Sequence, residues 1–474
     1  MLKPFTLLLA LCGWAALARA QTPATYNFYY GNLHAHSSYS DGNQDEARTG
    51  YATPLQNYSF ADASLHFDFL GISEHNHSQA GMRLANYARG LRQADSATVD
   101  GSFVALYGME WGVISGGGHV LVYGVDQLLG WEAGNFDVFV PRSNYQALFK
   151  EINRRPGAFA MLAHPQTGDY GNLASGTFSP TADSAVVSTV LRSGPATSTN
   201  ITYSNPSTSS YESTYQRLLA RGYHVGISLD HDNHNTTFGR TTPGRLVVLA
   251  PSLTKASLMQ ALRARRFYAS DDWNAQVNFM LNDEPMGSIL QGGTNAAISV
   301  SVADTDNEGV RSLTLMRGVP GNGVNAVVLA TAPAGAAALT FTDTNVLNSS
   351  YYYYAIIVQA DGNRIVTSPI WYNRTSALSS AAGQELARLE VFPNPVSGGS
   401  ATLSYALPAS ASVTLEVLDA LGRPVHTLAR AERQAAGPHA YELSTAQSQL
   451  AAGLYTIRLT QDGAATYRKL VVAE

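Results

Sequence analysis

Short apolar runs alternate with helix-like stretches over the first half of the chain. Strands are predicted at Tyr26–Leu33, Phe67–Ser73, Ser102–Trp111, Val120–Val125, Ala158–Ala163, Val225–Leu229 and Arg245–Leu249. Helices are predicted at Gly81–Ala94, Asn144–Arg154, Tyr211–Arg221 and Thr254–Arg266. This alternation is typical of a parallel α/β domain, either a barrel or a doubly wound sheet, whose working residues lie at the carboxyl ends of the strands. The Ser/Thr-rich segment Ser179–Ser210 interrupts the pattern and is expected to be a long surface excursion.

The second half of the chain has a different pattern. From about residue 275, Gly and Asn turns separate short strands at Ala297–Val302, Ser312–Arg317, Leu339–Thr342, Tyr351–Val358 and Arg364–Ile370. This spacing predicts an antiparallel β-sandwich of immunoglobulin-like size over residues 275–374. Within it, Tyr351–Tyr354 fits either a sugar-binding platform or the alternate core and edge positions of one strand. A Ser/Ala-rich linker over 375–387 leads to a last β-rich segment over 388–474.

Composition and charge narrow the class of protein. At 474 residues the chain is expected to hold two to four domains. Its 45% hydrophobic and 14% charged residues describe a folded protein. A net charge of −5 argues against nucleic acid as the main partner.

Residues 1–20 have the pattern of a secretory signal peptide. Lys3 supplies the positive charge, Phe5–Leu11 the apolar core and Ala18-Arg19-Ala20 the cleavage site. The one cysteine, Cys12, lies inside this segment, so a metal site in the mature chain must use imidazole and carboxylate ligands. No later segment is long and apolar enough to be expected to span a membrane.

Ten of the twelve histidines fall between His34 and His234, and most of them lie at or just beyond the end of a predicted strand. His34 and His36 face the same way because residues i and i+2 of a strand do, and Glu110 can bridge two cations as an imidazole cannot. A set without thiolates suits two or three ions of Zn²⁺, Mn²⁺ or Fe²⁺. The candidate ligands are His34, His36, Asp41, His75, Glu110, His119, His164, Asp232 and His234.

The order of these motifs resembles that of the PHP family, named after polymerase and histidinol phosphatase domains. The motifs are H-x-H-x4-D-G at 34–42, E-H-N at 74–76, a strand-end Glu110, G-H at 118–119, A-H-P at 163–165 and D-x-H at 232–234. The resemblance covers roughly Tyr26–Asp272, and Leu262–Ser270 resembles the end of the carbaryl-hydrolase-like subgroup. It implies an α/β fold, a distorted (β/α)7 barrel over 21–274, with a binuclear or trinuclear metal site.

The resemblance also implies a role for each candidate. One ion would take His34, His36, Glu110 and Asp232, and a second would take His75, His119 and His164 while sharing Glu110. Asp41 and His234 would hold a third ion, or orient the substrate if two ions are present. Metal-bound hydroxide would be the nucleophile, with Glu110, Asp232 and His234 as the catalytic residues.

Several positions stay open within this assignment. Position 74 is Glu where the family more often has Asp. Asp230 and His231 compete with Asp232 and His234, which are preferred because they keep the D-x-H spacing. For substrate binding, an arginine fork suits a phosphate or a carboxylate. The candidates are Asn76, Arg240 and Arg245.

The last segment resembles the type A sorting domain of the type IX secretion system. The similarity rests on F-P-N-P-V at Phe392–Val396, L-G-R-P-V at Leu421–Val425 and G-L-Y-T-I-R-L at Gly453–Leu459. It implies passage across the outer membrane of a Gram-negative bacterium of the Bacteroidetes type. The type IX machinery would then be a partner, and the protein would be released or attached to the cell surface.

Three functions follow as hypotheses. The first is a secreted metal-dependent phosphoesterase that acts on a small-molecule phosphomonoester or phosphodiester. The second is a carboxylic or carbamate ester hydrolase on the same metal site, favoured by the subgroup resemblance and by the few cationic residues near the motifs. The third is a non-catalytic surface protein whose β-modules bind polysaccharide.

Overall fold

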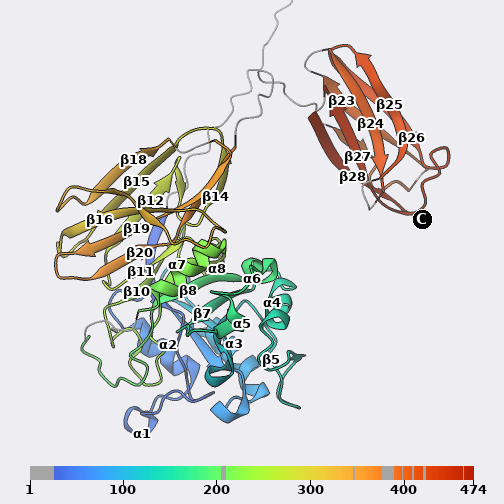
Figure 1. Cartoon of the computed structure of the whole chain (residues 1–474). Coiled ribbons are helices and arrows are strands. Elements are labelled where there is room, and N and C mark those ends of the chain that lie inside the picture. The colour runs from blue at the N-terminus through green and yellow to red at the C-terminus, as the bar shows by residue number, and fades with distance from the viewer. Residues whose placement is uncertain are drawn as a thin grey trace, which may run out of the picture. The chain divides into compact units, whose positions relative to one another are not determined.

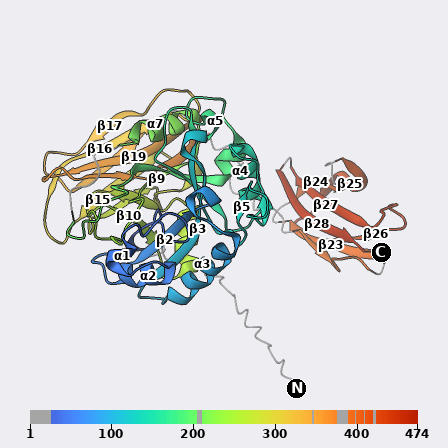
Figure 2. The ribbon, with the colours of Figure 1, turned by 90° about the horizontal axis from the view of Figure 1, so that it is seen from below.

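The computed structural model describes residues 26–203, 210–344, 347–375, 389–397, 399–407, 410–419, 423–462 and 464–473. The chain divides into two compact units, unit 1 over Met1–Ser376 and unit 2 over Ala377–Glu474 (Figures 1 and 2). The predicted signal peptide and nearly all of the predicted linker over 375–387 lie outside the described residues.

The main sheet of unit 1 joins strands from both halves of that unit. Its hydrogen-bonded order is β14-β21-β19-β20-β11-β10-β1-β2-β3-β4-β7-β8-β9, with β16 and β17 attached at β19. The strands of unit 1 are β1 (Asn27–Asn32), β2 (Phe69–His75), β3 (Val104–Val113), β4 (Gly118–Tyr123), β5 (Leu129–Gly130), β6 (Val138–Phe139), β7 (Phe159–Ala163), β8 (Val186–Arg192), β9 (Gly226–Leu229), β10 (Arg245–Ala250), β11 (Phe267–Ser270), β12 (Gln276–Leu281), β13 (Glu284–Pro285), β14 (Ile289–Gly292), β15 (Ala296–Ala303), β16 (Val310–Gly318), β17 (Val327–Thr331), β18 (Ala338–Asp343), β19 (Ser349–Gln359), β20 (Arg364–Thr367) and β21 (Ile370–Arg374).

The predicted fold, an α/β domain with a distorted (β/α)7 barrel, is wrong. The structure is mostly β, and although β1, β2 and β3 run parallel, β3–β4, β4–β7, β1–β10 and β10–β11 are antiparallel pairs. Residues 114–117 alone connect β3 to β4, and so short a connection holds no crossover helix. The sheet also continues through β11 into β20 and β19 of the second half. At its other edge β9 pairs with β8 and with no other strand among the described residues.

Each strand predicted in the first half overlaps an observed strand, but the expected surface excursion hides one more. Strand β8 lies inside Ser179–Ser210, and its residues are buried except Arg192, which is partly exposed. The run Val186-Val187-Ser188-Thr189-Val190-Leu191 has the β-branched composition of a buried strand, which the Ser/Thr-rich flanks concealed.

Helices pack against the main sheet through buried aromatic and aliphatic side chains. The helices of unit 1 are α1 (Glu46–Thr49), α2 (Pro54–Asp62), α3 (Leu84–Ala97), α4 (Tyr145–Asn153), α5 (Asp169–Asn172), α6 (Pro180–Ala185), α7 (Glu212–Arg221) and α8 (Lys255–Arg263). Helix α2 begins with a capping box between Thr53 and Gln56, which fixes its direction onto the sheet. Its Tyr58 then donates to the carbonyl of Leu106 in β3 at 2.6 Å.

A second sheet of order β13-β12-β15-β18 covers the part of the main sheet formed after residue 275. Strand β15 alternates buried and exposed residues, and its Ile298 and Val300 pack in a core with Tyr353 of β19. On the opposite face of β19, Tyr352 and Tyr354 enter the core of the first half. Tyr352, Tyr353 and Tyr354 are therefore core residues, which excludes the sugar-binding platform considered for this run.

Unit 2 is a two-layer β structure around its own apolar core. Its sheets have the orders β22-β23-β26 and β25-β24-β27-β28. The core includes Leu403, Val413, Leu415, Ile457 and Leu470. The strands are β22 (Glu390–Phe392), β23 (Ser400–Leu407), β24 (Ala411–Leu418), β25 (Pro424–Gln434), β26 (Gly437–Ser444), β27 (Gly453–Gln461) and β28 (Ala464–Val472).

Candidate metal centre

The nine predicted ligands come together at one edge of the main sheet. Parallel strands present their carboxyl ends at this edge, and β4, which runs the other way, presents its start. His75 and Glu110 are register partners across β2 and β3, and His119 lies opposite Ala163, the residue before His164. We call the full set the imidazole cluster: His34, His36, Asp41, His75, Glu110, His119, His164, Asp232 and His234.

Glu110 is the centre of the cluster and is 1% exposed. Its Oε1 lies 3.0 Å from His34 Nε2, 2.9 Å from His119 Nδ1 and 3.1 Å from His164 Nε2. Its Oε2 lies 3.3 Å from His36 Nε2 and 3.1 Å from His75 Nδ1. Because imidazole nitrogens surround both oxygens, this carboxylate is placed to bridge two cations.

Asp232 faces the same imidazoles from the other side. Its Oδ1 lies 3.0 Å from His34 Nε2 and 3.3 Å from His36 Nε2. The loop that carries it is tied to the β1 end by a backbone hydrogen bond from His36 to Asn233 at 2.8 Å. His34, His36, Glu110 and Asp232 thus form one group that can hold a metal ion, and His75, Glu110 and His119 form another.

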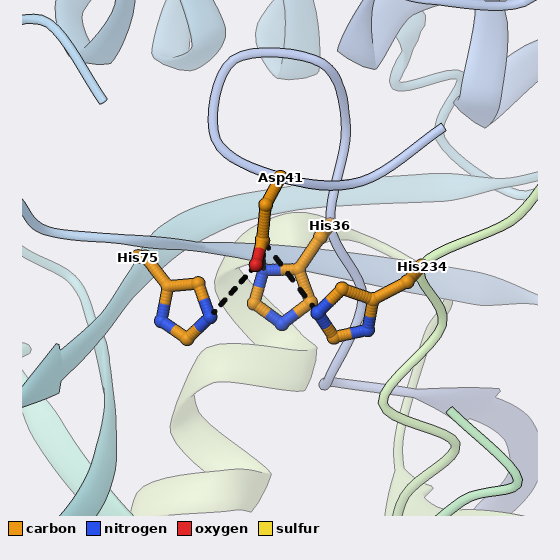
Figure 3. Close-up of side chains that lie close together, drawn as sticks. All are labelled: His36, Asp41, His75 and His234. Carbon is orange, nitrogen blue, oxygen red and sulfur yellow. Dashed lines mark ion pairs between the residues drawn. The ribbon is translucent and has the colours of Figure 1, made fainter. Parts of the chain in front are cut away.

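A third group lies around Asp41, as Figure 3 shows. Asp41 Oδ1 lies 3.5 Å from His234 Nε2 and 3.9 Å from His36 Nδ1, and Oδ2 lies 3.6 Å from His75 Nε2. These separations are too long for ordinary hydrogen bonds, yet the ring nitrogens and the carboxylate point toward one another (Figure 3). His36 and His75 belong both to this group and to the groups that contain Glu110.

The donor atoms of the cluster fit a metal centre. His34 Nε2, His75 Nδ1, His119 Nδ1 and Asp41 Oδ1 are buried, and their contacts with oppositely charged groups do not have the geometry of hydrogen bonds among the described residues. Buried polar atoms are almost always hydrogen-bonded. Several buried donor atoms without hydrogen bonds that converge on common points are therefore consistent with metal ligands. The absence of thiolates suits Zn²⁺, Mn²⁺ or Fe²⁺.

The electrostatics of the cluster show how metal and proton would compete. Burial alone would raise the pKa of Glu110, but His119, His34 and His75 outweigh it and hold that pKa well below its usual range. Burial would likewise lower the pKa of His36, but Asp232 and Glu110 raise it to about 10. The charged form of Glu110 is thus favoured, and a metal ion that binds His36 would compete with a proton for the ring nitrogen.

Residues behind the cluster fix the orientation of the ligands. Asp230, which is 4% exposed, places Oδ2 3.1 Å from His34 Nδ1, on the side of the ring away from Glu110. Such a carboxylate holds the ring and its tautomer in place. His231 points elsewhere, with Nε2 2.8 Å from the carbonyl of Gly244. Of the two competing pairs, Asp232 and His234 therefore lie in the cluster.

Glu74 supports the loop that carries Asp41. Its buried carboxylate accepts hydrogen bonds from the hydroxyls of Ser37 and Ser40 and from the backbone N–H of Ser37. Burial raises the pKa of Glu74. From the sequence, Glu74 was noted only as a departure from the family motif, and its support of the Asp41 loop was not predicted. Its position beside His75 in an apolar strand was the signal that could have indicated a buried, structural carboxylate.

The side chains of the three candidate substrate residues are hydrogen-bonded to other protein groups. Arg245 is fully buried, and its five N–H groups donate to the carbonyls of Leu65, His66, Gly239, Thr242 and Gly244. Asn76 bonds the carbonyl of Leu129 and the N–H of Gly112. Arg240 donates to Ser64 and Ala63. These contacts hold loops and strands in place, so the structure gives no support to a substrate role for the three side chains.

Comparison with known proteins bears on unit 2. Residues 394–465 match the family model of the FlgD Ig-like domain, in agreement with the two-layer β structure found there. No family model of the PHP type or of the type IX sorting type is matched. No curated protein matches the chain. Within the described residues, every helix is too short or too polar to span a bilayer.

Proposed function

We propose that the chain is a metal-dependent hydrolase of the PHP type that cleaves a phosphoester of a small molecule. The observation that carries the proposal is Glu110, whose two oxygens meet five imidazole nitrogens within 3.3 Å. Two or three divalent ions bound there would lower the pKa of water and neutralise charge that develops on the ester oxygens.

The chain's own residues would prepare this reaction. Glu110, Asp232 and the histidines would hold the ions, and Asp230 would keep the His34 ring in one orientation. Burial of Glu110 and His34 excludes water from the ligand shell, which strengthens each electrostatic contact. Asp41 is the most exposed carboxylate of the cluster, with a side chain that is 40% exposed. It therefore lies where a substrate would enter, and it would orient that substrate or hold a third ion.

One observation favours a carboxylic or carbamate ester as the second candidate substrate. Arg245, Arg240 and Asn76 are committed to protein groups, so the proposed substrate side chains offer no charge for a phosphate. A neutral ester needs no such charge, because it presents only a carbonyl oxygen to the ions.

We also propose that the protein is secreted, with residues 388–474 acting as a type IX sorting domain. The support is the set of sequence motifs at Phe392–Val396 and Gly453–Leu459, together with the independent β unit that contains them. Its substrates would then be extracellular small molecules.

Elemental analysis and parallel assays test the enzymatic proposal. The chain from residue 21 is purified, its ions are counted, and an aryl phosphodiester, an aryl phosphomonoester and an aryl carbamate are assayed side by side. We expect two or three ions per chain, and turnover that a chelator abolishes and one of Zn²⁺, Mn²⁺ or Fe²⁺ restores. Preference for the carbamate would select the second candidate, whereas less than one ion per chain without metal-dependent turnover would reject both.

A further inference from the structure

Unit 1 contains a second group of charged side chains, outside the imidazole cluster. Asp272 follows β11, Asp304 and Glu308 lie between β15 and β16, and Gln359 is the last residue of β19. One carboxylate oxygen from each of Asp272, Asp304 and Glu308 lies within 4.8 Å of the other two. We call these four residues the acidic cluster. They join the connection between the two halves of unit 1 to the ends of two strands.

The terminal amide of Gln359 lies among the three carboxylates and is buried, with the residue 1% exposed. Its Nε2 lies 3.0 Å from Asp272 Oδ2, 2.8 Å from Asp304 Oδ2 and 3.2 Å from Glu308 Oε2. An amide nitrogen has two N–H groups and can serve two of these three oxygens at most. Its Oε1 is buried and has no hydrogen-bond partner among the described residues.

Exchange of the two amide atoms makes Gln359 a fourth oxygen donor. A half-turn of the amide places Oε1 where Nε2 now meets the carboxylates, and the two orientations differ only in their hydrogen-bond partners. With a cation at the centre, Oε1 would be a fourth oxygen ligand beside the three carboxylates. Asn274, close by in the chain, also has a buried Oδ1 without a hydrogen-bond partner.

The donors to the acidic cluster among the described residues are uncharged: the Gln359 amide and the backbone N–H groups of Asn274 and Asp306. No Lys, Arg or His side chain in the described part of the chain forms an ion pair with Asp272, Asp304 or Glu308. Burial, with Asp272 and Asp361 as neighbours, raises the pKa of Glu308 to about 7. Carboxylates crowded together in a partly buried place repel one another unless a cation or a proton compensates.

We propose that Asp272, Asp304, Glu308 and Gln359 bind a hard divalent cation, with Ca²⁺ preferred over transition metals. All four donors are oxygens, and neither imidazole nor thiolate is present to favour Zn²⁺. The ion would tie the start of the second sheet to the end of β19 in the main sheet, and so would stabilise the packing of the two layers. This site is independent of the proposed hydrolase function.

Thermal unfolding and terbium luminescence test this site in the chain from residue 21, with the imidazole cluster first saturated by its own metal. Ca²⁺ at about 100 times its dissociation constant should raise the folded-to-unfolded ratio about a hundredfold and increase Tm. Tb³⁺, which replaces Ca²⁺, should show emission sensitised by Trp273, whose Nε1 lies 3.5 Å from Asp306 in the same loop region. Excess Ca²⁺ should quench that emission.

Two double variants, each of which removes two negative charges, distinguish loss of this site from a general effect of lower negative charge. Asp304→Asn with Glu308→Gln should lose the Ca²⁺ shift and the Tb³⁺ emission, while its metal-free Tm stays equal or rises because repulsion is relieved. Asp283→Asn with Glu284→Gln, at two exposed positions where the chain turns from β12 into β13, should behave like wild type. Gln359→Leu tests the amide oxygen by itself and should weaken Tb³⁺ binding about tenfold or more.

Three results would overturn the proposal. The first is a wild-type protein whose Tm does not respond to Ca²⁺, because the carboxylates would then serve only as acceptors for Gln359. The second is a Ca²⁺ shift that survives in Asp304→Asn with Glu308→Gln. The third, which applies if that double variant fails to fold, is a folded Gln359→Leu variant that binds Tb³⁺ as tightly as wild type.

Discussion

The two polar clusters of unit 1 differ in donor chemistry and in the way the fold builds them. The imidazole cluster combines six histidines with three carboxylates at the strand ends of the main sheet. The acidic cluster has oxygen donors only and lies where that sheet meets the second one. Nitrogen-rich sites suit Zn²⁺, Mn²⁺ or Fe²⁺, whereas oxygen-only sites suit Ca²⁺. We therefore expect the two clusters of unit 1 to select ions of different hardness.

The supports of the two clusters differ in the same way. Behind His34 stands Asp230, and beneath the Asp41 loop stands Glu74, so that the imidazole cluster has a second layer of carboxylates. In the acidic cluster the described supports are backbone N–H groups, which donate from Asn274 to Asp272 Oδ1 and from Asp306 to Asp304 Oδ1, and the central side chain is an amide. A catalytic centre needs ligands held in fixed orientation, whereas an ion that cross-links two sheets needs only charge and coordination number. We therefore propose catalysis for the first cluster and stabilisation of the fold for the second.

Glu110→Gln should have the largest effect, and it should impair the imidazole cluster without affecting the acidic cluster. The amide cannot bridge two cations, so we expect loss of bound ions and a fall in turnover on the order of 10²–10³-fold or more. The Ca²⁺ response of Tm should remain, because the acidic cluster is untouched. Elemental analysis, the ester assays and thermal unfolding measure these three quantities.

Glu46→Gln is the matched control, because Glu46 is exposed in α1 and the substitution makes the same change of charge. It should keep ions, turnover and Ca²⁺ response. Full turnover in Glu110→Gln would contradict the bridging role of Glu110. Loss of the Ca²⁺ response in that variant would show that the two clusters are not separate.

How far the sequence predicts this arrangement depends on how local each signal is. His34, His75 and Glu110 could be found because each follows or ends an apolar run, and strand ends of one sheet meet at one edge. The burial of Arg245 and its five bonds to backbone carbonyls could not be predicted, because neither leaves a trace in the neighbouring residues. The side chain looks the same in the sequence whether it faces solvent or the core.

The remaining errors have a non-local cause as well. The barrel was wrong because strand pairing direction depends on which strands meet, and β11 meets β20 about a hundred residues later. The segment Asp304–Glu308 is visibly acidic, but Gln359 and Asp272 join it only through the packing of the two sheets. Asp230 was weighed only as a rival ligand, because the orientation of His34 cannot be deduced from spacing.

Asp230→Asn should have a smaller effect that tests the second layer of the imidazole cluster. Loss of the charge behind His34 should weaken metal affinity about 10–100-fold, with turnover recovered when the metal is raised to saturation. Titration of metal-free protein followed by the ester assay measures both quantities. Asp100→Asn, in an exposed turn, is the control. A loss of turnover that saturating metal cannot restore would make Asp230 more than a positioning residue.

Removal of unit 2 should have the smallest effect. Unit 2 has its own sheets and its own apolar core, and none of its described strands pairs with a strand of unit 1. A chain that ends at Thr375 should therefore keep the number of bound ions, and its turnover and Ca²⁺ response should change by less than about twofold, as expected for independent folding units. Loss of the ion from either cluster in this shortened chain would contradict that independence. It would mean that unit 2 stabilises a site to which its described residues contribute no ligand.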